Sequence, residues 1–182
     1  MTDKTGPFTI TIDDSQVQRW FGELLQRAQD QSGLMADVRE YLIESTQGRF
    51  TTGIGPDGIA WAALADGSGR TPLLKSGRMR DGINGESGPD WVEIYSDARQ
   101  ARWHQEGTKP YEIRAKPGKS LYWPGMGTRP GKDGAEVPAF VRKVNHPGLP
   151  ARPFMGISSD DDQVIGDLAI AWLELGDSSS AG

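Results

Sequence analysis

The sequence predicts an α+β protein in which N-terminal helices and a C-terminal helix pack on an antiparallel sheet, with a long projecting loop. Two observations lead to this prediction. Apolar residues recur with helical spacing near both ends of the chain, whereas the middle alternates short strand-like segments with glycine-rich turns. The chain also holds 24 glycines and 12 prolines among 182 residues, more than long helices absorb. Segregated helices and strands are typical of the α+β class.

The composition indicates a globular protein that folds as one domain over residues 1–182, with 1–7 and 177–182 as flexible tails. Hydrophobic residues make up 36% of the chain and charged residues 25%. The net charge of −5 argues against DNA binding by the whole domain, since free nucleic-acid binders are usually basic. The absence of cysteine excludes a disulfide framework and a thiolate zinc site. Because no secretion signal or membrane-spanning run is recognised, we expect folding in a cytoplasm.

The first fifty residues predict a strand and a helical region. Alternating apolar residues at Phe8–Ile12 indicate a short strand. An amphipathic helix follows, with its apolar stripe at Val17, Trp20, Phe21, Leu24, Leu25 and Ala28. A second helical pattern runs from about Leu34 to Phe50. Gly33 stops the first helix or bends the chain, so one kinked helix and two separate helices both stay open.

The middle of the chain predicts a strand, a short helix and a loop. Trp91–Ser96 is rich in β-branched and aromatic residues, which favours a strand. Asp97–Glu106 has the character of a short helix that ends at Gly107. The stretch Thr108–Gly134 is interpreted as a long loop, and loops of such length in compact domains are typically functional or disordered.

The last third predicts a returning strand and a final helix. Pro138–Val144 alternates in the manner of a strand. The helix begins near Ser158 or Ser159 and ends at Gly176. Asp160–Asp162 fall in its first turn, where the helix dipole stabilises anions, so we interpret them as helix-start residues and not as a metal site.

No catalytic, cofactor-binding or metal-binding residue is predicted. His104 and His146 lie far apart in the sequence and lack a partner at metal-ligand spacing. We therefore expect each imidazole to hydrogen-bond a nearby backbone group and fix a turn. An alternative with a different function is a hydrolase that uses His104 with Glu106 or Asp97.

The tryptophans divide into two groups. Four are expected in the core, because they lie on apolar helix stripes or in strand-like segments: Trp20, Trp61, Trp91 and Trp172. Trp103 and Trp123 stay open. Trp123 suits the anchoring of a loop or a partner, since buried Trp and Tyr dominate interface hot spots. A carbohydrate-binding module that uses both is a further alternative.

The predicted loop carries a cluster of basic and aromatic residues. These candidate contact residues for a neighbouring subunit or partner are Lys109, Arg114, Lys116, Lys119, Tyr122, Trp123, Arg129 and Lys132. A solvated loop surface and a patch that meets acidic protein or DNA both stay open. An acidic body with a basic loop suits a closed ring, in which the loop of one subunit lies on the acidic face of the next.

Three motifs in the same order carry a resemblance to a known family. They are Leu74-x-x-Gly77, His104-Gln105-x-Gly107-Thr108, and the continuous run Leu149–Ile157 before the terminal helix. Together they resemble the virion morphogenesis proteins of Mu-like tailed phages, also called tail completion proteins. The resemblance assigns a fold-shaping role to His104, Gly107, Thr108, His146, Pro150, Arg152, Pro153 and Phe154.

The resemblance implies a structural role and no enzymatic activity, cofactor or membrane. Such a protein would sit at the head–tail junction of a virion assembled in the bacterial host cytoplasm. It would form a ring of identical subunits, expected to be a hexamer, which caps the tail tube and allows head joining. Its partners would be the tail tube protein and the neck or connector proteins, with DNA passing transiently through the lumen. A head-completion adaptor or stopper bound to the portal is the alternative.

Overall fold

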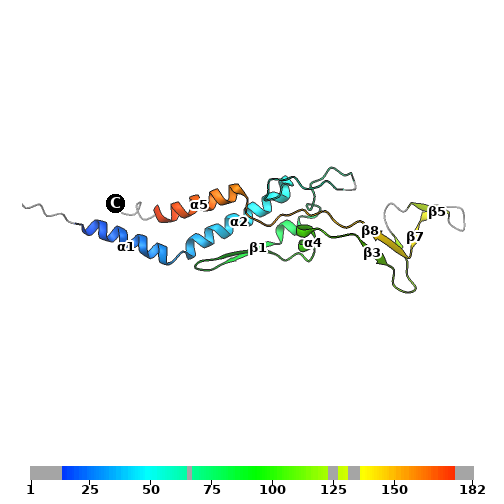
Figure 1. Ribbon diagram of the computed structural model, residues 1–182, viewed down its shortest axis with the longest axis horizontal. Helices are drawn as coiled ribbons and strands as arrows, with labels where there is room; N and C mark the ends of the chain where they lie inside the picture. The colour runs from blue at the N-terminus through cyan, green and yellow to red at the C-terminus, as the bar shows by residue number, and fades with distance from the viewer. Residues whose placement is uncertain (1–13, 65–66, 123–126, 131–135, 175–182) are drawn as a thin grey trace, which may run out of the picture. The chain divides into compact units, whose positions relative to one another are not determined.

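The computed structural model describes residues 14–64, 67–122, 127–130 and 136–174 (Figure 1). The chain divides into two compact units. The first, called the helical unit here, draws on residues 1–45, 84–95 and 157–182, and the second, called the arm unit, on residues 46–83 and 96–156. Each unit is therefore assembled from segments that lie far apart in the sequence.

Helices and a hairpin build the described part of the helical unit. The elements are α1 (Ser15–Gln29), α2 (Ser32–Thr52), β1 (Ile83–Ser87), β2 (Val92–Ser96) and α5 (Ser159–Glu174). The end of α2 from residue 46, Ile83 of β1 and Ser96 of β2 are counted with the arm unit. The predicted strand Phe8–Ile12 and the two predicted tails lie outside the described residues.

One stripe of α2 forms the core of the helical unit. Leu34, Val38 and Leu42 recur every four residues and are at most 8% exposed. The side chains packed around them from the hairpin and α5 are Val92, Ile94, Ile165, Leu168, Ala169 and Trp172. Burial of an aliphatic side chain stabilises by about 1.5–3 kcal/mol over exposure. The C-terminal helix thus packs on α2 and α2 packs on the hairpin, which confirms the predicted α+β class.

The N-terminal helical region is two helices, and Gly33 does not separate them. The first ends at Gln29, and Asp30 Oδ1 accepts a hydrogen bond from Ser32 N (3.0 Å) at the start of α2. Gly33 lies inside the first turn of α2, where a Cβ would be 2.3 Å from the Trp172 ring. The glycine therefore serves the packing of α5, and the prediction that it stops a helix is wrong.

The start of α5 confirms that the three aspartates are helix-start residues. Ser158 N donates to Asp161 Oδ2 (2.7 Å) and Asp161 N donates to Ser158 Oγ (3.1 Å), a reciprocal cap. Asp161 is 1% exposed, and its other oxygen accepts from Tyr41 Oη (3.1 Å) and Ser45 Oγ of α2. Burial, followed by the bond to Asp161, raises the pKa of Tyr41. One carboxylate therefore caps α5 and ties it to α2.

In the arm unit, short strands run outward and return. They are β3 (Tyr111–Arg114), β4 (Leu121–Tyr122), β5 (Thr128–Pro130), β6 (Glu136–Pro138), β7 (Phe140–Val141) and β8 (Lys143–His146). They pair antiparallel in nested order, β3 with β8, β4 with β7 and β5 with β6. Two short helices, α3 (Arg78–Asp81) and α4 (Ala101–Glu106), precede them. We call residues 109–148 the arm.

The interpretation of Thr108–Gly134 as a loop is therefore wrong, because this stretch contains three of these strands, β3, β4 and β5. The predicted return strand Pro138–Val144 exists but is interrupted at Ala139 and Arg142. The one predicted sheet is replaced, over the described residues, by four two-stranded sheets. Strands of two to four residues are too short for an alternation signal, and turns such as that at Pro117 read as loop.

Burial corrects two of the four tryptophan predictions. Trp61 is 7% exposed and lies in a core, as expected, and Trp172 is half-buried against α2. Trp20 and Trp91 are each 45% exposed. Trp20 belongs to α1, which contains no buried residue, and Trp91 lies just before β2.

None of the helices within the described ranges combines the length and the apolar character needed to cross a membrane.

Candidate functional site: a basic arm and its anchor

The base of the arm continues into an extended segment, Leu149–Gly156, which we call the anchor. Arg49, near the end of α2, donates through Nη1 to the carbonyl oxygens of Phe154 (2.7 Å) and Gly156 (2.9 Å). Arg49 is 7% exposed, so its charge is taken out of water and is compensated by carbonyl dipoles. This buried arginine fixes the far end of the anchor.

Gln105 of α4 holds the same stretch from another side. Its Oε1 accepts from the backbone N–H groups of Phe154 (2.9 Å) and Met155 (3.0 Å), and its Nε2 donates to Met155 O (3.0 Å). The side-chain amide of Gln105 thus makes the backbone hydrogen bonds that a neighbouring strand would otherwise make. The backbone of His104 adds a further link, since its carbonyl accepts from Arg152 N at 2.7 Å.

Arg152 ties the anchor to the loop that follows α2. Its Nε donates to Ala62 O (2.9 Å) and its Nη2 to Ala63 O (3.1 Å). The residue is 5% exposed, and burial lowers the pKa of its guanidinium, which stays charged at any physiological pH. Trp61 Nε1 also donates to Pro153 O (2.8 Å). Each of these contacts has a backbone group on one side, and Arg152 is the anchor residue that contributes its own side chain to them.

An aromatic cluster lies beneath the anchor. Phe50 and Phe154 are 0% and 1% exposed, with ring centroids 5.1 Å apart. Trp61 meets Phe50 edge to face at 5.6 Å. Such contacts add about 0.5–1.5 kcal/mol to the burial of the rings. The phenylalanine of the Leu149–Ile157 motif is thus the apolar centre of the anchor.

Two glycines close the base of the arm. Thr108 and Leu149 form an antiparallel bridge (Thr108 N to Leu149 O, 2.9 Å; Leu149 N to Thr108 O, 3.2 Å). Gly107 and Gly148 flank this bridge with φ of +72° and +89°. A Cβ at Gly148 would lie 2.2 Å from Thr108 O, and one at Gly107 would lie 2.8 Å from Leu149 O. Only glycine combines these angles with this approach.

The two histidines differ from each other. His146 Nδ1 accepts from Gly148 N (3.0 Å) and its ring stacks on Tyr111 at 4.8 Å, which confirms the predicted backbone contact. For His104 that prediction is wrong, because Nδ1 is buried without a hydrogen-bond partner among the described residues. Burial, followed by the charge of Arg152, lowers the pKa of His104. Neutral His104 is therefore a packing residue beside Arg152.

The structure brings most of the motif residues together. His104, Gly107, Thr108, Arg152, Pro153 and Phe154 meet at the anchor, while His146 lies at the base of the arm and Pro150 is an exposed residue of the anchor. Sequence reasoning missed Arg49, Trp61, Gln105 and Gly148 as members of this site. Gln105 stands in a recognised motif, whereas an arginine late in a helix gives no local signal of its distant carbonyl partners.

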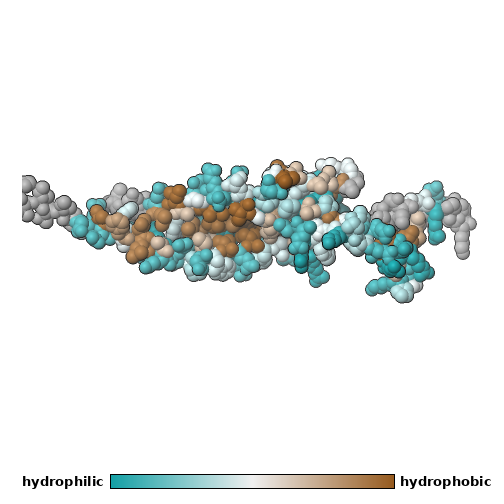
Figure 2. All heavy atoms as spheres, in the orientation of Figure 1, coloured by the Kyte–Doolittle hydropathy of each residue, from teal (hydrophilic) through white to brown (hydrophobic). Residues whose placement is uncertain are grey.

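The arm is strongly basic on its described residues. The predicted cations Lys109, Arg114, Lys116, Lys119 and Arg129 are all exposed, as are Arg142 and Lys143, which were not predicted. Figure 2 shows this character as teal spheres over β3. Trp123 and Lys132 lie outside the described residues. Lys116 and Lys119 belong to one turn, closed by Lys119 N donating to Lys116 O (2.9 Å).

The carboxylates of the arm only partly offset this charge. Glu112 pairs with Arg114 (2.5 Å) and Lys143 (3.2 Å), and the bond from Lys143, before the other causes, lowers the pKa of Glu112. Glu136 accepts a hydrogen bond from Thr128 Oγ1 across the β5–β6 pair. In the described arm, these two acidic side chains stand against seven basic ones.

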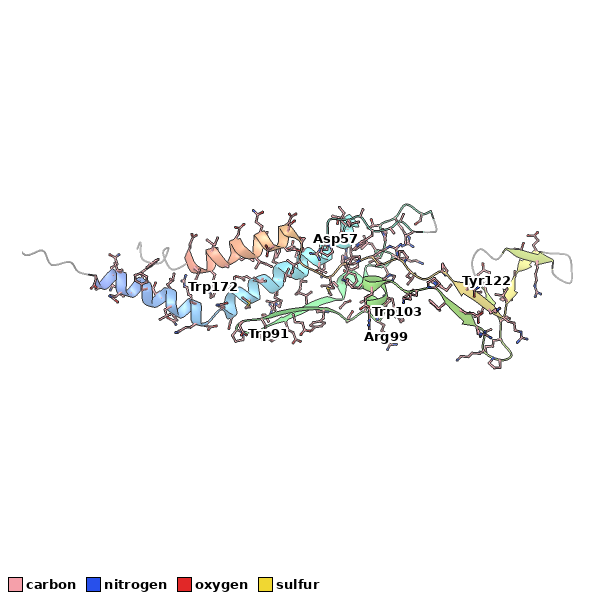
Figure 3. The ribbon with its side chains drawn as sticks, in the orientation of Figure 1. Asp57, Trp91, Arg99, Trp103, Tyr122 and Trp172 are labelled. Atoms are coloured by element: carbon pink, nitrogen blue, oxygen red, sulfur yellow. The ribbon has the colours of Figure 1, made fainter. Side chains whose placement is uncertain are left out.

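Exposed aromatic residues lie between these charges. Tyr122 of β4 (Figure 3) and Phe140 of β7 face each other across the ladder with ring centroids 6.2 Å apart, and they are 57% and 49% exposed. Tyr111 of β3 is 50% exposed. Aromatic and arginine residues are enriched at protein interfaces, where they supply most of the binding energy.

Within the described residues, the side chains of the alternative hydrolase site are not joined to each other. Glu106 accepts from Arg102 Nε (3.1 Å), and no hydrogen bond joins His104 to Glu106 or Asp97 among the described residues. Within those residues, no group of three or more side chains that could hold a metal ion is present. Trp103 is 55% exposed on α4 (Figure 3), but its proposed partner Trp123 lies outside the described residues.

Comparison with known proteins assigns the family. The model of the phage virion morphogenesis family matches residues 12–174, which include both units and all three motifs. No curated protein and no solved structure matches the chain significantly. The family model covers far more than half of the sequence. The chain is therefore a member of the phage virion morphogenesis family, whose proteins have a structural role in building the phage particle.

Proposed function

We propose that this protein is a ring subunit at the head–tail junction, where it caps the tail tube and allows the head to join. Family membership supports a structural role in virion and tail morphogenesis. One observation carries the finer assignment, namely the opposite charge of the two units. A closed ring of identical subunits requires two different patches that complement each other on every copy.

The charge difference between the units is large. The described residues of the helical unit contain three basic side chains, Arg19, Arg27 and Arg39, whereas carboxylates occur on each of its helices and both strands. In α5 the charged residues are all acidic: Asp160, Asp161, Asp162, Asp167 and Glu174. The arm is basic. Complementary potentials of this kind speed and orient association.

The ring proposal also accounts for the division of labour in the arm unit. The anchor fixes the base of the arm through buried contacts, while the outer strands leave their cations and aromatic rings exposed. The partners would be further copies, expected as a hexamer, and beyond them the tail tube and connector proteins. DNA would meet the ring only in transit through the lumen.

Phage particles test the position of the protein. A phage that lacks this gene should accumulate filled heads and separate tails of abnormal or uncapped length, as counted by electron microscopy. The purified protein should restore joining when it is added to the tails before the heads. If it instead restores joining when it is added to the heads alone, the protein is a head-completion adaptor and the tail-capping function is wrong.

Charge reversal tests the role of the arm. Lys116→Glu with Lys119→Glu should leave folding intact and shift the purified protein from oligomer to monomer in native mass spectrometry. The matched control is Lys75→Glu, an exposed lysine of the arm unit outside the arm. If both proteins show the same oligomers, the arm does not mediate assembly. If the double variant keeps its oligomeric state and loses only the ability to retain DNA, the basic arm contacts DNA and not a neighbouring subunit.

A further inference from the structure

The apolar face of α1 has no cover within the described residues. Val17, Trp20, Phe21 and Leu25 form one stripe with helical spacing and are 45% to 58% exposed. α1 contains no buried residue at all. A helix of 15 residues is marginal in water without packing, so such a stripe indicates a surface that is completed by a partner.

This stripe joins an exposed apolar part of α5. Trp20 and Leu24 of α1 and Leu173 of α5 line one shallow hollow, with Glu23 and Arg27 beside them. The two helices are tied at this point, because Arg27 Nη1 donates to Trp172 O (3.1 Å) and Trp172 Nε1 donates to Arg27 O (3.5 Å). Leu173 itself is 42% exposed. We call this surface the α1–α5 face; Figure 2 shows its α1 part as brown spheres on the surface.

The surroundings of this face are acidic. Asp162, Asp167 and Glu174 are exposed on α5, which has no basic residue between Ser159 and Glu174. The face therefore combines large apolar side chains with a negative rim. A partner that fits it should offer exposed apolar or aromatic side chains surrounded by positive charge.

The arm has this combination. Tyr122 and Phe140 are exposed as a pair, and Arg142 lies next to β7 while Lys119 lies shortly before β4. From this complementarity we infer that the α1–α5 face of one copy receives the arm of a second copy, with Tyr122 and Phe140 against the α1 stripe and the arm cations against the α5 carboxylates. The inference rests on the proposed self-assembly and supplies its receiving surface. The contact is head to tail, so it leaves one free arm and one free face on each chain of copies until a ring closes.

Two full-length variants and their mixture test this contact. The arm variant carries Tyr122→Ser and Phe140→Ser, and the face variant carries Phe21→Ser and Leu25→Ser. Ile59→Ser is the control, because Ile59 is 66% exposed and lies outside both surfaces. Native mass spectrometry and sedimentation over a concentration series measure assembly, and circular dichroism verifies folding.

The expected pattern is specific to a head-to-tail contact. Wild type and the control should assemble, while each variant alone should associate at least about tenfold more weakly, since hot-spot truncations cost that much or more. The 1:1 mixture should form a dimer with one copy of each variant, because the intact arm of the face variant meets the intact face of the arm variant. Larger species should not form from the mixture.

Three results would overturn the inference. The first is wild type that remains monomeric at every concentration, since a second copy is then not the occupant. The second is an arm variant that assembles as wild type does, because that result means that α1–α5 faces pair with each other. The third is a 1:1 mixture that yields no mixed dimer. If a serine variant misfolds, Lys116→Glu with Lys119→Glu and Asp167→Lys with Glu174→Lys replace the two sets and should behave in the same way.

This outcome is separable from that of the proposed function. The mixing experiment uses purified protein alone, so it can succeed even if phage without the gene joins heads and tails normally. Conversely, if the added protein restores tail capping while the mixture stays monomeric, the function stands and the assigned receiving surface is wrong.

Discussion

The anchor and the arm are neighbours in one chain, but the anchor is held by buried side chains and hydrogen bonds, whereas the arm exposes cations and aromatic rings. In the anchor, Phe154 is 1% exposed, and Arg49, Gln105 and Arg152 all direct their polar groups at backbone. In the arm, Tyr122 is 57% exposed and the ladders are at most four residues long. The comparison teaches that the His104–Thr108 and Leu149–Ile157 motifs of this chain maintain the support, whereas the residues available for contact lie between them. Damage to the anchor should therefore reduce stability, and damage to the arm should reduce assembly.

The largest difference is expected from the aromatic residues of the two regions. Phe154→Ala removes a fully buried ring and leaves a cavity beside Phe50, which should lower the free energy of unfolding by about 3–5 kcal/mol. Tyr122→Ala should change it by less than about 1 kcal/mol. Denaturant unfolding of both variants measures the contrast. Equal losses would show that the arm is as tightly packed as the anchor.

The next contrast compares two cations. Arg152→Met keeps the apolar stem but leaves the carbonyl oxygens of Ala62 and Ala63 without their donor. The expected loss in the free energy of unfolding is about 2 kcal/mol. Lys143→Met removes an exposed ion pair with Glu112, and exposed ion pairs add little to stability. Thermal unfolding under one set of conditions ranks them. A costlier Lys143→Met would contradict the division between support and contact.

Two glycines sharpen the boundary between the regions. Both Gly148 and Gly118 have positive φ, but a Cβ at Gly148 meets Thr108 O at 2.2 Å, whereas nothing lies within 4 Å of one at Gly118. Gly118→Ala should cost about 1 kcal/mol for the backbone conformation alone. Gly148→Ala should cost more, since the bridge between Thr108 and Leu149 must also open. Amide hydrogen exchange at Thr108 and Leu149 should accelerate in Gly148→Ala only, and identical exchange in both variants would refute a closed arm base.

The smallest effect concerns His104 and acidic pH. Its pKa is lowered in the folded state, so the unfolded chain binds the proton more readily. Stability from neutral His104 is complete above the ordinary histidine pKa of about 6.5 and is lost as the pH falls through that value toward the folded-state pKa. His104→Gln should flatten the fall of Tm between about pH 7.5 and 5.5. A profile that parallels wild type would mean that His104 does not titrate on unfolding.

The sequence predicts the fold to the extent that periodicity reports it. The patterns of α1, α2 and α5 are long enough to be recognised, and the three aspartates of α5 follow directly from helix electrostatics. The arm was interpreted as a loop because strands of two to four residues carry no measurable alternation. The exposure of Trp20 was also missed, since an amphipathic pattern shows which face is apolar but not whether the same chain covers it.

The candidate site shows the same limit in another form. The motifs located Arg152 and Phe154 in one run, and the structure gives the reason for their clustering. The partners Arg49 and Trp61 come from distant segments and act on backbone carbonyls, which have no sequence signature. The sequence indicates an acidic body with one basic segment, but the fold is needed to show which distant segments make up the acidic unit.

Imaging of the assembled phage tests the central claim most directly. A cryo-electron microscopy reconstruction of the head–tail junction should show a ring of this protein at the head-proximal end of the tail tube, with the arm of each copy against the helical unit of the next. The account is contradicted if the protein lies elsewhere in the particle, or if a ring is present in which the arms point away from neighbouring copies.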